Sequence, residues 1–207
     1  MPNPINLSTD AISNLLASTD DIEIDSPSNG FQEITGISPQ RLYQSAVLMP
    51  LLIHESSWHL LFTRRNVALP EHSGQVAFPG GRCDPDDETI EFTALREAEE
   101  EIGLIKKDVR VIGRLNRFLT VTRYLVTPIV GVIPWPYQLR LANEEVSRVF
   151  TIPLEWLAAP ANHEIRKRVL PDPFGKVPVV YFREYDGEVL WGASARFTLR
   201  LIKILDL

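Results

Sequence analysis

The feature that most constrains this chain is a long irregular stretch that runs directly into a helix. Residues 65–87 carry helix-breaking residues at short intervals: Pro70, Gly74, Pro79, Gly80, Gly81 and Pro85. From Thr89 to Gly103 helix formers dominate, with an apolar stripe at helical spacing and a glycine at the expected end. Long loops inside compact domains are usually functional, so the loop and the helix together predict a site.

The predicted helix carries acidic side chains on one face. Glu97, Glu100 and Glu101 stand at positions i, i+3 and i+4, which share a face. Like charges at this spacing each oppose helix formation by roughly 0.2–0.5 kcal/mol. A hard divalent cation removes that repulsion because it takes oxygen ligands. Metal binding therefore explains the cluster, and a solvated acidic surface is the alternative.

The neighbouring residues favour metal binding over a solvated surface. Gly80 and Gly81 precede the helix, where a backbone without side chains can place a carbonyl on a metal or approach a phosphate. Arg96 stands beside Glu97 and is suited to holding a neighbouring carboxylate in one orientation. The joint occurrence of Gly-Gly, Arg-Glu, Glu-Glu and a terminal Gly-Leu indicates a metal site more strongly than the acidic run alone.

These residues resemble the signature of the Nudix hydrolases. Residues 96–104, Arg-Glu-Ala-Glu-Glu-Glu-Ile-Gly-Leu, match its second half position by position. The first half differs by one residue: counting back from Arg96 puts Glu88 in the early acidic position, and counting forward from Gly81 puts Asp87 there. One insertion in the loop explains both counts and leaves both residues as candidates to assist the metals.

The resemblance implies an α+β fold, the family's α/β/α sandwich around a mixed β-sheet. The signature would form a loop-helix-loop that binds Mg²⁺ or Mn²⁺. The groups implied as metal ligands are Glu97, Glu100, Glu101 and Gly81.

The reaction implied by the resemblance is hydrolysis of a nucleoside diphosphate linked to another moiety. Metal ions can activate the attacking water and neutralise charge that develops on the diphosphate. Arg96 is implied as a further catalytic residue. The general base is expected to be a signature Glu or a residue of a later loop, where Glu144 and Glu145 are candidates and Glu145 is preferred.

Two further stretches are similar to the coenzyme A pyrophosphatase branch of this family. They are residues 60–81, from Leu60-Leu61-Phe62-Thr63-Arg64-Arg65 to Gly80-Gly81, and residues 190–196. The branch implies cleavage of coenzyme A or an acyl derivative into adenosine 3',5'-bisphosphate and a phosphopantetheine. The groups expected to face the substrate are Arg64, Arg65, His72 and Gly80. Bracing of the loop backbone is the alternative role for His72.

Two rival functions remain open from the sequence. One is a Nudix hydrolase that acts on another nucleoside diphosphate derivative, such as ADP-ribose or a dinucleoside polyphosphate. The other is a non-catalytic binding module, which is expected to lose signature carboxylates. Here Glu97, Glu100 and Glu101 are all present.

Periodicity predicts the remaining elements. Helices are expected over residues 7–18 and 194–207, hairpins over 46–64 and 177–191, and strands over 109–115 and 124–133. Residues 144–150 lead into residues 152–157, which are expected to form a short strand entering a helical turn. Residues 1–40 are expected to form an N-terminal helix and an extended arm, and residues 41–207 the hydrolase domain. The acidic cluster of the arm, Asp20, Asp21, Glu23 and Asp25, is expected to be solvated.

Composition narrows the partners. The 207 residues carry a formal net charge of -6, which argues against broad binding to nucleic acid because phosphate backbones are held by clustered Lys and Arg. Cys83, the one cysteine, excludes an intrachain disulfide framework. Without an apolar run long enough to span a membrane or a secretory signal, we expect a cytoplasmic monomer or homodimer that takes a small nucleotide substrate.

Overall fold

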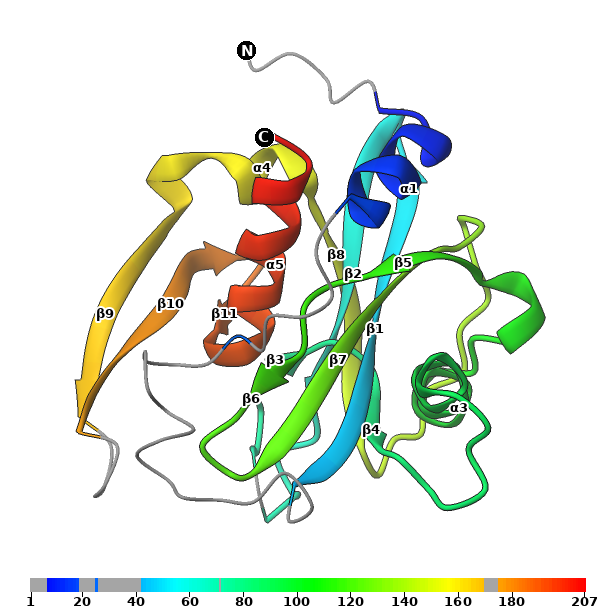
Figure 1. The fold of residues 1–207 in the computed structure, drawn as a ribbon, viewed down its shortest axis with the longest axis horizontal. Helices are drawn as coiled ribbons and strands as arrows, with labels where there is room; N and C mark the ends of the chain where they lie inside the picture. The colour runs from blue at the N-terminus through cyan, green and yellow to red at the C-terminus, as the bar shows by residue number, and fades with distance from the viewer. Residues whose placement is uncertain (1–6, 19–24, 26–41, 71, 170–174) are drawn as a thin grey trace.

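Two β-sheets organise the chain in the computed structural model, which describes residues 7–18, 25, 42–70, 72–169 and 175–207 (Figure 1). The strands of the larger sheet are β1 (Tyr43–His54), β2 (Ser57–Arg65), β3 (Val76–Ala77), β4 (Gly80–Arg82), β5 (Arg110–Arg114), β6 (Phe118–Leu119), β7 (Tyr124–Val132) and β8 (Val146–Pro153). The smaller sheet contains β9 (His163–Val169), β10 (Lys176–Tyr185) and β11 (Glu188–Trp191). The helices are α1 (Thr9–Ala17), α3 (Ile90–Ile102), α4 (Leu154–Ala158) and α5 (Gly192–Ile204), with short 3-10 turns η2 (Lys106–Asp108) and η3 (Pro160–Asn162).

The larger sheet is mixed. Strand β1 runs parallel to β7, with Tyr43 opposite Tyr124, and antiparallel to its hairpin partner β2. Strand β8 pairs antiparallel with β2, and β5 with β7. The short strands β3 and β4 pair with β2 and β1, so the predicted irregular loop is fastened to the ends of the central strands.

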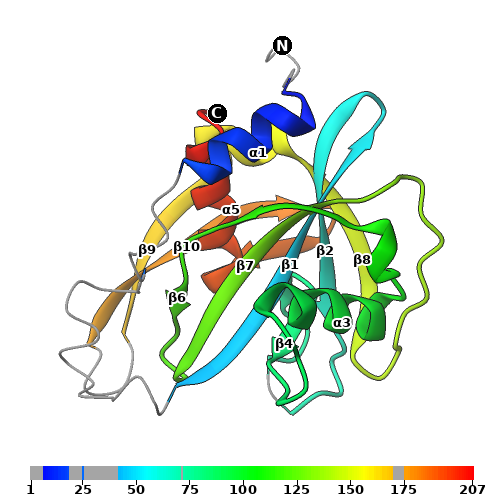
Figure 2. The same ribbon diagram turned by 45° about the vertical axis from the view of Figure 1, so that its right-hand side comes forward.

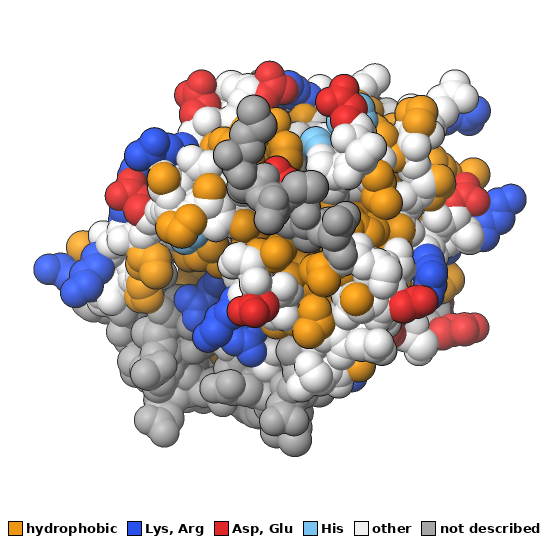
Figure 3. All heavy atoms as spheres, turned by 90° about the horizontal axis from the view of Figure 1, so that it is seen from above, with side chains coloured by type: hydrophobic (Ala, Val, Ile, Leu, Met, Phe, Trp, Pro, Cys, Tyr) orange, Lys and Arg blue, Asp and Glu red, His pale blue; other side chains and the backbone are white. Residues whose placement is uncertain are grey.

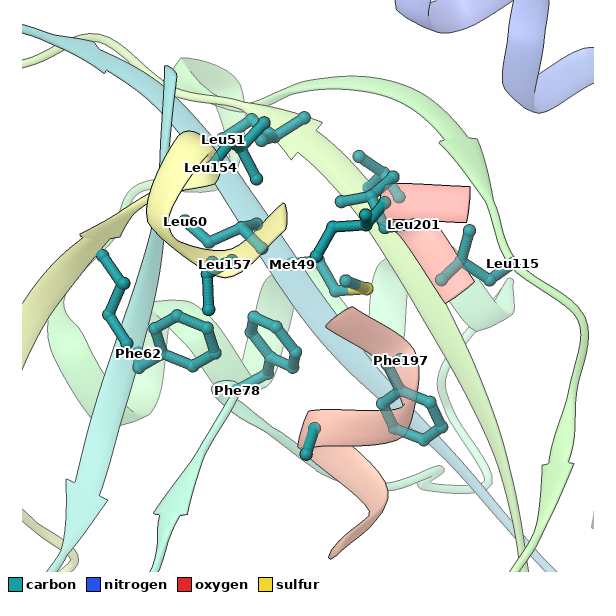
Figure 4. Close-up of a cluster of buried hydrophobic side chains, with 14 of the residues drawn as sticks. Met49, Leu51, Leu60, Phe62, Phe78, Leu115, Leu154, Leu157, Phe197 and Leu201 are labelled. Carbon is teal, nitrogen blue, oxygen red and sulfur yellow. The ribbon is translucent and has the colours of Figure 1, made fainter. Parts of the chain in front are cut away.

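Helices cover both faces of the larger sheet, because successive residues of a strand point to opposite faces. On one face Leu48 and Leu52 pack in a buried cluster with Ala98 of α3. On the other, Met49 and Leu51 pack in a cluster with residues of α1, α4 and α5. Figure 2 shows α3 and α5 on opposite sides of the sheet, and Figure 4 shows the second cluster. The predicted α/β/α sandwich is confirmed.

The N-terminal helix belongs to this core. The Ser8 side chain accepts a hydrogen bond from the Ala11 backbone and begins α1, and Ile12 is fully buried. The indole Nε1 of Trp58 donates to the Leu7 carbonyl oxygen at 2.8 Å. The rest of the predicted arm, apart from Asp25, lies outside the described residues, and the domain boundary near residue 40 stays a prediction.

Besides the short elements β3, β4, β6, η2 and η3, the sequence did not predict strand β9, the longest of these elements in the described part of the chain. Its residues are mostly charged, and none of them is buried. It lies at the edge of the smaller sheet, where charged side chains commonly protect a strand from pairing with another chain. The periodicity that revealed the other strands is therefore absent from it.

Charged side chains are dispersed over the surface seen in Figure 3. Lys and Arg lie there in several separate groups among acidic and apolar side chains. No helix in the described part of the chain is long and apolar enough to cross a membrane.

Candidate active site

The signature helix α3 is fixed at both ends by local chemistry. Thr89 caps its first turn, with Oγ1 accepting from the Phe92 backbone at 3.1 Å. Gly103 ends it in the left-handed conformation, at φ 68°. Ala94, Ala98 and Ile102 are buried against the sheet. The acidic side of the helix therefore has a fixed orientation relative to β4 and the loops beside it.

Asp87 fixes the position of the Arg96 guanidinium. The guanidinium donates through Nε and Nη2 to the two carboxylate oxygens of Asp87 at 2.9 and 3.0 Å. Thr93 Oγ1 and the Asp84 backbone N–H also donate to Asp87. These hydrogen bonds, chiefly those from Arg96, hold the pKa of Asp87 well below its usual range. Of the two early acidic candidates, Asp87 therefore contacts the signature, while Glu88 is exposed.

Arg96 in turn orients the signature carboxylates, as expected from the sequence. Its Nη1 donates to Glu97 at 2.9 Å and to Glu100 at 3.0 Å. The Glu97 side chain is only 17 % exposed, whereas Glu100 is 59 % exposed. The acidic face is thus divided between one carboxylate turned inward and one turned to solvent.

Glu101 is the most buried of the three signature carboxylates, at 5 % exposure. Burial, followed by the charges of Glu97 and Glu145, raises its pKa to about 8. A hydrogen bond from the Gly80 backbone and the charge of Arg65 oppose that rise. Burial also raises the pKa of Glu97, and Glu145 contributes there as well. The negative charge around Glu101 is therefore larger than the charge of Arg65 and the Gly80 hydrogen bond compensate.

The two glycines before the helix allow this close packing. A Cβ on Gly81 would lie 2.5 Å from the Glu97 carboxylate, so Glu97 rests directly on the β4 backbone. A Cβ on Gly80 would lie 2.3 Å from the Ala46 carbonyl oxygen of β1. Side chains at these positions would displace the carboxylate or separate the strands.

The loop between β7 and β8 brings Glu145 to this site. The Ala142 backbone donates to the Glu101 carbonyl, which ties the loop to the end of α3. The backbone N–H of Asn66 donates to the Glu145 carbonyl at 2.7 Å, and the Asn66 side chain donates to the Asn143 carbonyl at 2.6 Å. Asn66 is a positioning residue that the sequence gave no signal for.

A cavity of about 660 Å³ opens beside Glu101, whereas Glu97, Glu100 and Glu145 are not among the residues that line it. At one end it is lined by Glu101, Gly80, Gly81 and Arg65. Its walls continue between the two sheets, past apolar side chains of β6, β7, β10 and α5. The arrangement suits a long ligand with a charged group at one end.

The four expected substrate groups are not all placed in this cavity. Arg65 and Gly80 line it, and the buried Nε of Arg65 has no hydrogen-bond partner in the described part of the chain. His72 lines it and also bonds Gln75 through Nδ1 at 2.9 Å, so both of its proposed roles remain open. Arg64 is absent from the lining and donates to buried Glu188 at 3.4 Å. Its expected contact with substrate stays a prediction without support from this placement.

The donor set has the chemistry that a divalent cation requires. Glu101 is a buried carboxylate whose charge is incompletely compensated, Glu97 is partly buried and paired with Arg96, and the charge of Glu145 acts on both. Among the described residues, no three His, Cys, Asp or Glu side chains form a ready-made metal cluster. The metal roles of Glu97, Glu100, Glu101 and Gly81 therefore stay predictions.

Comparison with known proteins identifies the family of this site. The sequence model described as NUDIX domain matches residues 42–172. The chain belongs to the Nudix family. A relative from Photorhabdus laumondii, named an uncharacterized Nudix hydrolase NudL, is 40 % identical over 174 residues, which cover 81 % of this chain and 89 % of the relative. A Yersinia pestis protein of the same name is 40 % identical over 155 residues, covering 73 % of this chain and 74 % of the relative.

Solved Nudix structures are more distant. The Nudix hydrolase of Alicyclobacillus acidocaldarius has a TM-score of 0.48 and 22 % identity, covering 56 % of this chain and 81 % of that one. A likeness at this level carries no functional conclusion. The family match and the NudL relatives assign the chain as a Nudix hydrolase of nucleotide diphosphate derivatives, a class that generally depends on divalent metal.

Proposed function

We propose that this Nudix hydrolase cleaves the diphosphate of coenzyme A or an acyl derivative, giving adenosine 3',5'-bisphosphate and the corresponding phosphopantetheine. The observation that carries the proposal is the position of Glu101. It is a buried carboxylate with excess negative charge around it, at one end of a cavity whose remaining wall is largely apolar. Such a cavity suits a ligand with a diphosphate next to a long, weakly polar arm.

The cavity is large enough for a substrate of this kind. Ligand pockets commonly measure about 300–1,000 Å³, and this one measures about 660 Å³. The resemblance of residues 60–81 and 190–196 to the coenzyme A branch supports the same assignment. Trp191 and Arg196 of the second stretch line the far part of the cavity.

We propose Glu97, Glu100, Glu101 and the Gly81 backbone as the groups that hold Mg²⁺ or Mn²⁺. When bound, the metal would supply positive charge against the diphosphate and activate water. Arg96, anchored on Asp87, keeps Glu97 and Glu100 in one orientation.

The chain's own groups supply the remaining chemistry. Arg65 offers guanidinium donors to the diphosphate oxygens, consistent with its buried unpartnered Nε. Glu145 accepts the proton of the attacking water at its carboxylate, since its charge acts on both Glu97 and Glu101 from the loop between β7 and β8. A hydrogen bond from the Gly80 backbone favours the charged form of Glu101, which is the form that binds a metal.

Hydrolysis in H₂¹⁸O tests the proposed function. The protein is incubated with coenzyme A and Mn²⁺, and mass spectrometry locates the label in the products. We expect label in one of the two phosphate fragments. Intact coenzyme A across a range of metals would contradict the substrate assignment, and cleavage of ADP-ribose or a dinucleoside polyphosphate in its place would select that rival. If none of these substrates is cleaved in a single-turnover assay with Mg²⁺, the result would support a non-catalytic binding module.

A pair of variants separates the site from a general effect of charge on α3. Glu101→Gln should abolish turnover. Glu99→Gln serves as its control, because Glu99 lies on the same helix but pairs with Lys106. Equal losses in both variants would contradict the assignment of Glu101.

A further inference from the structure

One residue of the N-terminal region reaches the wall of the cavity. Asp25 forms a parallel bridge with Phe118: its backbone N–H donates to the Arg117 carbonyl at 2.8 Å, and its carbonyl accepts from the Leu119 N–H at 2.9 Å. Asp25 thereby adds one residue to the edge of β6. The expectation that this member of the acidic cluster is solvated is wrong.

The Asp25 side chain forms an ion pair with Arg196 of α5. Arg196 donates to it through Nε at 2.7 Å and through Nη2 at 2.5 Å, a bidentate pair. The two side chains are 34 % and 30 % exposed. The Arg196 guanidinium also lies 5.6 Å from the centroid of the Phe118 ring. Asp25 thus joins β6 to the first turns of α5, two elements that are far apart in the sequence.

Arg196 and Phe118 both face the cavity. Phe118 packs edge-on against Phe197, at 5.6 Å between ring centroids, and all three side chains line the part of the cavity away from Glu101. Because Asp25 compensates the charge of Arg196, this part of the wall is polar but is not a free cationic site. Val126 and Val180 add apolar surface, and the lining also includes polar groups of Thr120, Thr122, Arg168 and Ser194, of which Arg168 lies 5.1 Å from the Trp191 ring centroid.

Neither member of the pair belongs to the segment that matches the family. The NUDIX match covers residues 42–172, with Asp25 before it and Arg196 after it. The ion pair is therefore a feature of the flanking segments, although Phe118 and Val126 of the wall that it braces lie within the match. It differs in origin from the carboxylate end, which the matched segment supplies.

We propose that Asp25 is a positioning residue and Arg196 a specificity-determining residue for the part of the substrate beyond the diphosphate. This rests on the proposed function for the identity of that part, a long arm of low polarity. The bidentate pair holds Arg196 against Phe118, so the guanidinium forms part of the cavity wall and does not project into the cavity. Without Asp25, Arg196 becomes an uncompensated cation that is free to enter the apolar end.

The test compares Asp25→Asn with a matched control. Asp10→Asn also removes an Asp–Arg pair from the N-terminal region, since Asp10 accepts from Arg110 at 2.8 Å on the surface. Two readouts are used: kcat and KM for coenzyme A, and the affinity for the uncharged apolar dye N-phenyl-1-naphthylamine, which requires no turnover. Asp25→Asn should raise KM and weaken dye binding by roughly fivefold while kcat stays within about twofold. Asp10→Asn should change neither.

A double-mutant cycle with Arg196→Gln then shows whether the two residues act as a pair. We expect the effect of Asp25→Asn to disappear in the Arg196→Gln background, and Asp25→Glu to restore part of the wild-type KM. Unchanged KM and dye affinity in Asp25→Asn, a loss confined to kcat, or additive effects in the cycle would each overturn the inference. If wild-type protein leaves coenzyme A intact, the proposed substrate fails, while the dye comparison still decides the role of Asp25.

Discussion

Replacing Glu101 by Gln should stabilise the metal-free protein at alkaline pH. The carboxylate is 5 % exposed, and its pKa rises from 4.5 to about 8 in the folded chain. A raised folded-state pKa means that folding favours the protonated form. The stability associated with protonation is therefore complete below about pH 4.5 and is lost as the pH rises through about 8.

The magnitude follows from linkage. One pKa unit corresponds to about 1.4 kcal/mol, so Glu101 should cost the metal-free protein about 4 kcal/mol between about pH 5 and pH 8.5. Glutamine keeps an oxygen that can accept from the Gly80 N–H but carries no charge, so Glu101→Gln should lack this contribution. Typical domains are stable by about 5–15 kcal/mol, so the difference is large enough to measure.

Urea unfolding in the presence of a chelator provides the assay. Wild type and Glu99→Gln should lose stability over this pH range, and Glu101→Gln should lose about 4 kcal/mol less. Saturating Mg²⁺, at about 100 times its dissociation constant, should restore about 2.7 kcal/mol to wild type at the higher pH but not to Glu101→Gln. Parallel pH profiles for wild type and Glu101→Gln would refute the claim that this carboxylate is buried without sufficient compensation.

Three other substitutions probe the rest of the site. Glu100→Gln should lower kcat at least 100-fold with unchanged thermal stability, since Glu100 is largely exposed; a full rate would remove it from the metal ligands. Asp87→Asn should destabilise the fold by about 2 kcal/mol, measured by urea unfolding, because it leaves Arg96 without its main partner, and no change would show that the pair contributes little. Gly81→Ala should reduce turnover strongly by displacing Glu97, and a crystal structure with Glu97 unmoved would contradict that cause.

Much of the fold was predictable because local signals agreed with one another. The stripe of Ala94, Ala98 and Ile102, the Thr89 cap and the terminal Gly103 define α3 within a residue of its observed bounds. The β1–β2 hairpin follows from two apolar runs around a short polar turn. Strand β9 was missed because an exposed edge strand carries no periodic apolar pattern.

The site was predictable in composition but only partly in geometry. Spacing on one helix placed Glu97, Glu100 and Glu101 together, yet their different burial depends on β4 and on the loop that carries Glu145. Arg64 and Arg65 are neighbours on β2, and strand alternation alone indicates that they point to opposite faces. This alternation agrees with the structure, in which Arg65 lines the cavity and Arg64 binds Glu188.

The contacts made by Asn66 have a dynamic consequence. Its backbone and side chain bind the Glu145 loop, while its side-chain oxygen accepts from the Ala68 N–H in the segment that leads to His72. A shift of either loop is therefore transmitted to the other through a single residue. We expect a displacement of the segment that leads to His72 to displace Glu145, the proposed proton acceptor, as well.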